Sequence, residues 1–151
     1  RVIGMHFFNP PYIMKLVEVV KGAETNEEVV KAIMDICMQM GKVPVLCKDS
    51  PGFIVNRVAR PYYLESLKIA EEEIASFEDI DKILEATGFR MGPFRLMDLI
   101  GLDVNLATTE SVYHAFNEAP RFVPSAIQKE KVKQNLLGVK TGRGFYSYKQ
   151  E

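Results

Sequence analysis

The sequence has few cysteines, no tryptophan and almost no net charge. Its 151 residues include two cysteines, and 19 basic residues nearly balance 20 acidic ones, for a formal net charge of -1. Such a chain lacks the positive field that gathers nucleic acid or an anionic membrane, so we expect neither partner. Cys37 and Cys47 have no metal-ligand spacing and are too few for a disulfide scaffold. We expect them to be reduced core residues and expect no metal site.

Long apolar runs are also missing. No stretch approaches the roughly 20 apolar residues of a membrane span, and no charged-then-apolar leader opens the chain. The chain also opens without an initiator methionine, directly on a strand-like run. Because a lone terminal strand pair is marginally stable, we expect residues ahead of Arg1 to be missing.

A carboxylate interrupts an apolar strand. Glu18 lies within Leu16-Val17-Glu18-Val19-Val20, and His6 lies near the end of the apolar run at residues 2–8. Glu is rarely fully buried without a partner, because an unpaired buried carboxylate costs several kcal/mol. His6 is the nearest candidate partner. A carboxylate that orients an imidazole forms half of a general acid–base device, which is typical of an enzyme.

Residues 1–49 have the pattern strand, strand, helix, strand. After the two apolar strands, Thr25 and Glu28 have capping-box spacing and begin a helix that stops at Gly41. Residues 43–47 then form a short strand whose Pro44 favours an edge or a strand start. This pattern indicates the end of an α/β sheet.

Residues 50–151 have helical patterning instead. Ser50-Pro51-Gly52 can cap a helix that runs from Phe53 past Glu73 with a kink at Pro61, and Ser76 opens another that stops at Gly88. A longer helical region spans residues 91–116 with a break at Gly101, a last helix spans 124–138, and residues 139–148 are turn-rich. We therefore place a domain boundary between residues 49 and 50.

Five motifs carry a resemblance to a known family. They are HFFNP from His6, MKLVEV from Met14, SPGFIVNR from Ser50, GPFRLMDLIGLD from Gly92 and KTGRGFY from Lys140. Together and in this order, the chain resembles the L-3-hydroxyacyl-CoA dehydrogenases, which include the 3-hydroxybutyryl-CoA enzymes. The resemblance covers essentially the whole chain.

The resemblance implies a catalytic set and a cofactor. His6 would take the hydroxyl proton of an (S)-3-hydroxyacyl-CoA while hydride passes to NAD, and Glu18 would orient the ring and stabilise the imidazolium. Asn56 matches the family asparagine that binds the substrate oxygen. Asn9 and Lys140 match positions near the nicotinamide, although Asn9 reads equally as a turn residue and Lys140 as a solvated surface lysine. We expect His114, for which the family offers no role, to be structural.

The chain departs from the family in one respect. The Gly-rich fingerprint that cradles the pyrophosphate is absent, as is the active-site serine of the family. We therefore expect an α/β remnant, the end of a Rossmann-type NAD-binding domain, at residues 1–49. An all-α C-terminal dimerisation domain follows at residues 50–151. The intact parent would oxidise 3-hydroxyacyl-CoA in β-oxidation or 3-hydroxybutyryl-CoA metabolism, and this piece alone would be inactive.

Two alternatives remain open, and the assembly is a further expectation. The parent could be a dehydrogenase of the same fold that acts on a free 3-hydroxy acid, or this chain could be only a dimerisation module. A bacterial cytoplasmic enzyme is favoured, with a mitochondrial or peroxisomal one left open. We expect a homodimer, because the helices carry more apolar positions than a small domain can cover. These positions are Phe53, Ile54, Val55, Tyr62, Tyr63, Leu64, Leu67, Ile69, Leu96, Leu99, Ile100, Leu102, Val104 and Leu106.

Overall fold

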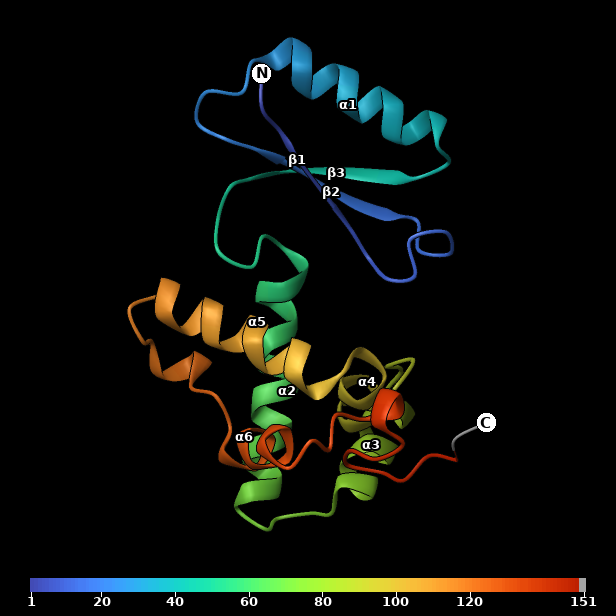
Figure 1. The fold of residues 1–151 in the computed structure, drawn as a ribbon, viewed down its shortest axis with the longest axis vertical. Coiled ribbons are helices and arrows are strands. Elements are labelled where there is room, and N and C mark those ends of the chain that lie inside the picture. Colours follow the sequence, from blue (N-terminus) through green and yellow to red (C-terminus); the bar gives the residue numbers. More distant parts are fainter. Residues whose placement is uncertain (150–151) are drawn as a thin grey trace. The chain divides into compact units, whose positions relative to one another are not determined.

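A computed structural model describes residues 1–149 of the chain. The chain forms two compact units, the first spanning Arg1–Val55 and the second beginning at Asn56 (Figure 1). The first unit contains the sheet and one helix, and the second unit is built from helices. An α/β unit followed by a helical unit is the expected order of fold classes.

The first unit is a three-stranded sheet covered by a helix. The strands β1 (Gly4–Phe7), β2 (Leu16–Lys21) and β3 (Val43–Lys48) lie in the order β1-β2-β3. The β1 strand is antiparallel to β2, and β3 is parallel to it, with α1 (Glu27–Gln39) as the crossover helix along the sheet (Figure 1).

The central strand β2 is buried on both faces. Val17 and Val19 pack with Cys37 of α1 in a core cluster, and all three are fully buried. Because side chains alternate along a strand, Glu18 points to the opposite face, where it is also buried. The fold thus places a carboxylate inside the protein, where it requires hydrogen-bond partners.

The helix α1 begins one residue later than the capping box predicted. Asn26 is the N-cap, and its side-chain oxygen accepts a hydrogen bond of 3.1 Å from the Val29 N–H. Thr25 does not cap the helix, because its hydroxyl accepts from the Gly22 N–H and donates to the Val2 carbonyl. The prediction of Thr25 as the cap was wrong, since these two backbone groups already occupy its side chain.

Among the residues that the structure describes, the second unit is built from five α-helices. The first of them, α2, starts at Val55, the last residue of the first unit. Their bounds are α2 (Val55–Glu71), α3 (Phe77–Ala86), α4 (Pro93–Ile100), α5 (Leu102–Ala115) and α6 (Ala126–Lys133), and two short 3₁₀ turns are η1 (Pro120–Phe122) and η2 (Val139–Thr141). The core of this unit consists of Tyr63, Leu67, Ile80, Phe94, Met97 and Leu102.

Several helix boundaries follow the predicted signals and others do not. Ser76 caps α3, and Gly101, at a φ of 101°, separates α4 from α5 as predicted. The last helix is shorter than predicted, because Asn135 takes a φ of 58° directly after the C-cap of α6. The helix α2 begins at Val55 rather than at Phe53, because Gly52 and Phe53 both have positive φ values.

Part of the apolar surface that suggested a dimer is covered within the chain. Tyr63, Leu67 and Leu102 belong to the core of the second unit, and Leu106 is also buried. These four positions therefore do not contribute to an exposed apolar face. Leu99, Ile100 and Val104 remain exposed, each by 41% or more. Among the described residues, no helix combines the length and apolar character needed to cross a membrane.

Candidate active site

His6 and Glu18 face each other on adjacent strands. They are direct partners in the antiparallel register of β1 and β2. The Nδ1 atom of His6 lies 2.7 Å from Oε2 of Glu18. The Glu18 side chain is only 1% exposed, whereas the His6 side chain is 32% exposed. An ionised carboxylate can only accept, so Nδ1 carries the proton in this pair and Nε2 is left as an acceptor.

The second oxygen of Glu18 binds the backbone at the start of α2. The N–H groups of Ile54 and Val55 both donate to Oε1 of Glu18, at 2.9 Å each. The first N–H groups of a helix have no partner within the helix and need an external acceptor. Glu18 supplies that acceptor, so both carboxylate oxygens are engaged and the carboxylate is fixed in orientation.

Two phenylalanine rings flank the imidazole of His6. The ring centroid of Phe8 lies 4.7 Å from that of His6, and the ring of Phe53 lies 5.5 Å away. Both rings are tilted by 58° to the imidazole plane. The imidazole is therefore bound by a carboxylate at Nδ1 and contacted by two aromatic rings, and these three contacts restrict its rotation.

The other predicted site residues lie elsewhere in the chain. Asn9 is exposed in the loop that follows β1. Asn56 is half-buried, follows Val55 directly in the first turn of α2, and accepts a backbone hydrogen bond of 3.0 Å from Nε of Arg60. Asn56 and Lys140 belong to the second unit, whereas His6 and Glu18 belong to the first.

Lys140 has a partner of its own. Its Nζ lies 2.7 Å from Oδ2 of Asp103 and 2.6 Å from Oδ1. This hydrogen bond lowers the pKa of the Asp103 carboxyl, against a smaller opposing effect of its burial. The ammonium group is thus held at η2 by α5 and is not a freely moving surface charge.

His114 is an exposed residue near the end of α5. Its side chain is 68% exposed, and its Nδ1 lies 3.7 Å from Oε1 of Glu118. It contacts the ring of Tyr113 at 5.6 Å. These are surface contacts, so His114 serves as a comparison for the histidine of the site.

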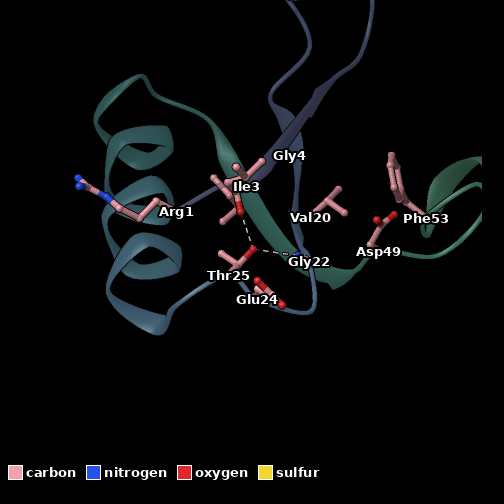
Figure 2. Close-up of a pocket in the computed structure, with 10 residues that line it drawn as sticks. Arg1, Ile3, Gly4, Val20, Gly22, Glu24, Thr25, Asp49 and Phe53 are labelled. Atoms are coloured by element: carbon pink, nitrogen blue, oxygen red, sulfur yellow. Dashed lines mark hydrogen bonds between the residues drawn. The ribbon is translucent and has the colours of Figure 1, made fainter.

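A cavity of about 460 Å³ lies in the first unit (Figure 2). Phe53 lines it together with Gly4 and Val20, and the charged groups at its wall are Arg1, Glu24 and Asp49. Two carboxylates against one guanidinium do not fit the pyrophosphate of a dinucleotide.

The start of α1 does not provide a pyrophosphate site either. Its N-cap is filled by the Asn26 side chain, and Glu27 and Glu28 occupy the first turn. Negative side chains at a helix N-terminus compete with a bound anion for the same N–H groups. The first unit thus holds a hydrogen-bonded His6–Glu18 pair, and neither its cavity nor the start of α1 fits the pyrophosphate of NAD.

Four contacts of the site lie outside the residues predicted from the sequence. They are the N–H groups of Ile54 and Val55 and the rings of Phe8 and Phe53. One signal could have indicated the two N–H groups. The residues before α2 end in Gly-Phe-Ile, which supply no side-chain cap, so the first N–H groups must find an acceptor elsewhere.

Family models match both parts of the chain. The model described as 3-hydroxyacyl-CoA dehydrogenase, C-terminal domain, matches residues 52–148. The model described as 3-hydroxyacyl-CoA dehydrogenase, NAD binding domain, matches residues 1–50.

Individual relatives agree with these matches. The chain is 52% identical to the 3-hydroxyadipyl-CoA dehydrogenase of Escherichia coli strain K12, over 100% of this chain and 32% of the relative. It is 45% identical to the mitochondrial hydroxyacyl-coenzyme A dehydrogenase of Rattus norvegicus, over 99% of this chain and 48% of the relative.

A solved structure is similar as well. The crystal structure of 3-hydroxybutyryl-CoA dehydrogenase from Escherichia coli K12 matches with a TM-score of 0.94 and 51% identity, over 99% of this chain and 32% of that one. The chain thus spans about a third to a half of the length of the relatives it matches. The resemblance predicted from the five motifs is confirmed, and the chain belongs to the 3-hydroxyacyl-CoA dehydrogenase family.

Proposed function

We propose that the whole protein containing this chain oxidises (S)-3-hydroxyacyl-CoA to 3-oxoacyl-CoA, or catalyses the reverse reduction, with His6 as the general base. The observation that carries the proposal is the contact of 2.7 Å between Nδ1 of the partly exposed His6 and the buried Glu18 carboxylate. A general base must be fixed in one tautomer and still reach its substrate, and this pair meets both conditions.

In this proposal each nitrogen of the imidazole has its own task, and the hydrogen bond to Glu18 supports the division. Because Nδ1 donates to Glu18, Nε2 is free to accept the hydroxyl proton of the substrate. The positive charge that then forms on His6 lies beside the Glu18 carboxylate, which stabilises it. In the reverse direction the imidazolium returns the same proton to the carbonyl oxygen.

Further residues complete the proposal. Asn56 would donate a hydrogen bond to the substrate oxygen, and Asn9 and Lys140 would contact the cofactor. Lys140 would do so with an ammonium group whose position Asp103 fixes. NAD, bound mainly by parts of the whole protein outside this chain, supplies the acceptor for the hydride.

Substrate turnover tests the proposed reaction against its alternative. The purified whole protein is assayed with NADH and acetoacetyl-CoA and, in parallel, with NADH and free acetoacetate. Binding energy from the CoA group should raise kcat/KM for the thioester about a hundred-fold or more above that for the free acid. Equal or greater turnover of the free acid would assign the protein to dehydrogenases of free 3-hydroxy acids. No turnover of either substrate would favour a dimerisation module.

We also propose that the whole protein is a homodimer that associates through its helical unit. Apolar side chains gather where α4 meets α5, and Leu99, Ile100 and Val104 are exposed there by 58%, 41% and 51%. Val139 of the neighbouring η2 is 44% exposed. Exposed apolar side chains that gather in this way are typical of a surface covered by another chain, and a two-fold axis is the simplest arrangement.

A further inference from the structure

Phe53 adopts a backbone conformation that is unusual for a bulky residue. Its φ is 45°, and the φ of the preceding Gly52 is 75°. Glycine adopts positive φ without cost, but a side chain with a Cβ is strained there, and a large aromatic residue is a clear outlier. The Phe53 N–H closes the turn by donating to the Ser50 carbonyl at 2.8 Å. A strained residue persists only where its surroundings impose it.

This turn presents two consecutive N–H groups to Glu18. Directly after Phe53, the chain turns so that the Ile54 and Val55 N–H groups meet at one oxygen, Oε1, at 2.9 Å each. The other oxygen is thereby left for His6. The turn at Phe53 thereby helps to fix the orientation of the Glu18 carboxylate, with one oxygen bound to the backbone and the other facing the imidazole.

The ring of Phe53 contacts the same imidazole. The centroid of its ring lies 5.5 Å from that of His6. Phe53 also lines the cavity of the first unit (Figure 2). The side chain of Phe53 thus contacts His6, and the two backbone N–H groups that follow Phe53 bind Glu18, the partner of His6. A glycine at this position would allow the turn without strain but would remove the ring contact.

Three other helix starts show that side-chain capping does not require this strain. The helices α1, α3 and α6 begin at Asn26, Ser76 and Ser125, each with an extended backbone and a side-chain oxygen that accepts from the first turn. None of these three starts uses a residue with positive φ. The helices α4 and α5 start after Gly92 and Gly101 without a side-chain cap, and the positive φ of Gly101 falls on a glycine, where it carries no strain. At the start of α2 the positive φ falls on a bulky residue, and the two N–H groups that follow it bind Glu18.

We propose that Phe53 is a positioning residue of the His6–Glu18 pair. Its strained backbone directs two N–H groups onto Glu18, and its ring limits the rotation of His6. This inference rests on the proposed function, because it assigns Phe53 a task in the proposed proton transfer. Phe53 does not exchange the proton itself and acts only through the other two residues.

The test uses the whole protein and three substitutions of Phe53. Phe53→Gly keeps the turn unstrained and removes the ring, Phe53→Leu keeps apolar bulk without an aromatic ring, and Phe53→Tyr keeps the ring. Glu73→Gly is the matched control, because Glu73 has a φ of 55° and follows α2 at its other end. For each variant, kcat and KM with 3-hydroxybutyryl-CoA are measured together with the thermal midpoint and the NMR resonance of the His6 Nδ1–H.

We expect Phe53→Gly to lower kcat about ten- to a hundred-fold with KM changed less than about three-fold, since a displaced base impairs the chemical step more than binding. Its His6 Nδ1–H resonance should shift or broaden. Phe53→Leu should lose less, and it provides the test if the glycine variant does not fold. Phe53→Tyr, which keeps the ring, should lose less kcat than Phe53→Leu, and the control Glu73→Gly should keep kcat within about three-fold of the wild type.

Two outcomes overturn the inference in distinguishable ways. If Phe53→Gly and Phe53→Leu keep wild-type kcat and an unchanged Nδ1–H resonance while His6→Gln is inactive, Phe53 has no positioning task and the proposed function stands. If His6→Gln itself keeps wild-type kcat, the proposed function fails and the inference fails with it.

Discussion

Glu18 accepts hydrogen bonds from three donors, and its two oxygens have different tasks. Oε2 binds the imidazole of His6, and Oε1 binds the N–H groups of Ile54 and Val55. A carboxylate that is 1% exposed would cost several kcal/mol if it were left without partners. The same three contacts that stabilise this buried acid hold it in the orientation that the proposed proton transfer needs.

Glu18→Gln should impair turnover more than stability. The amide oxygen can still accept from Ile54 and Val55, but the amide N–H₂ would then face Nδ1 of His6 and donate to it. That places the imidazole proton on Nε2, where the general base needs a lone pair. In the whole protein we expect kcat to fall about a hundred- to ten-thousand-fold, with little change in KM, measured by steady-state kinetics. A kcat within a few-fold of the wild type would contradict the assigned tautomer.

The need of Glu18 for a partner could be predicted from the sequence, but not all of its partners. An acidic residue inside an apolar strand requires a donor, and a histidine with the right strand spacing was available. The N–H groups of Ile54 and Val55 were not predictable in this way, because every residue has such a group and only the turn at Gly52 and Phe53 directs them to Glu18.

The ion pair of Asp103 and Lys140 should contribute to stability in a pH-dependent way. Lys140 lowers the pKa of Asp103, so the contribution is present above the unfolded carboxyl value of 3.8 and is lost as the pH falls through the lower folded value. Because the two side chains are 39% and 44% exposed, we expect only about 0.5 kcal/mol.

A double-mutant cycle measures this pair. Asp103→Asn, Lys140→Met and the double variant are unfolded with urea at pH 7 and at pH 3. The coupling energy should be about 0.5 kcal/mol at pH 7 and near zero at pH 3 or in 1 M salt. A coupling energy that does not change with pH would contradict the assigned ion pair.

At the scale of elements, two buried carboxylates hold the C-terminal segment against the helices. Asp98 of α4 is fully buried and accepts from the N–H groups of Phe145 and Tyr146 and from the Tyr148 hydroxyl, at 2.9 Å each. Asp81 of α3 accepts a hydrogen bond of 2.7 Å from the Tyr146 hydroxyl. Burial, followed by the hydrogen bond to Asp98, raises the pKa of Tyr148, so its hydroxyl remains a donor.

Asp98→Asn should therefore be strongly destabilising although it preserves the shape of the side chain. An asparagine has one acceptor oxygen, so at least one of the three donors would face an N–H₂ group in a buried site. We expect a loss of about 2–5 kcal/mol in the free energy of unfolding, measured by urea titration. Glu65→Gln, at an exposed position of α2, is the control and should change the free energy by less than about 0.5 kcal/mol. Equal stability of the two variants would contradict this role of Asp98.

The helix signals of the sequence were reliable where the cap is local. Ser76 precedes α3 and caps it with its own hydroxyl, as predicted. Thr25 has the same signature but binds two backbone groups of the loop and the N-terminal strand region, and the cap shifts to Asn26. At α2 the predicted cap at Ser50 is replaced by a carboxylate from a distant strand. Local patterns cannot indicate acceptors that come from another element.

At the scale of the whole molecule, two units fold around separate cores. Val17, Val19 and Cys37 form one core, and the cluster around Leu67 and Phe94 forms the other. The switch from strand to helix patterning near residue 50 predicted the order of the two fold classes. The apolar pattern of the helices did not show which apolar side chains face solvent. Helical periodicity identifies an apolar face, but it does not show which other element, or which other chain, covers that face.

The proposed homodimer can be tested at the surface where α4 meets α5. Leu99→Asp places a charge on a side chain that is 58% exposed, and Ile83→Asp places one on α3 at 62% exposure. Sedimentation equilibrium of the whole protein at micromolar concentration should give a dimer mass at low and high salt. Leu99→Asp should give a monomer and Ile83→Asp a dimer. A wild-type monomer at tens of micromolar would rule out the dimer, and dissociation by Ile83→Asp alone would place its interface on α3.

The central claim is that His6 is the general base, and the kcat of His6→Gln in the whole protein tests it most directly. The assay follows oxidation of 3-hydroxybutyryl-CoA at saturating NAD, with His114→Gln as the control, since His114 is 68% exposed and lies far along the chain in α5. We predict that His6→Gln lowers kcat about a hundred- to ten-thousand-fold with KM nearly unchanged and that His114→Gln has no effect. A His6→Gln variant that turns over within a few-fold of the wild type would contradict the account.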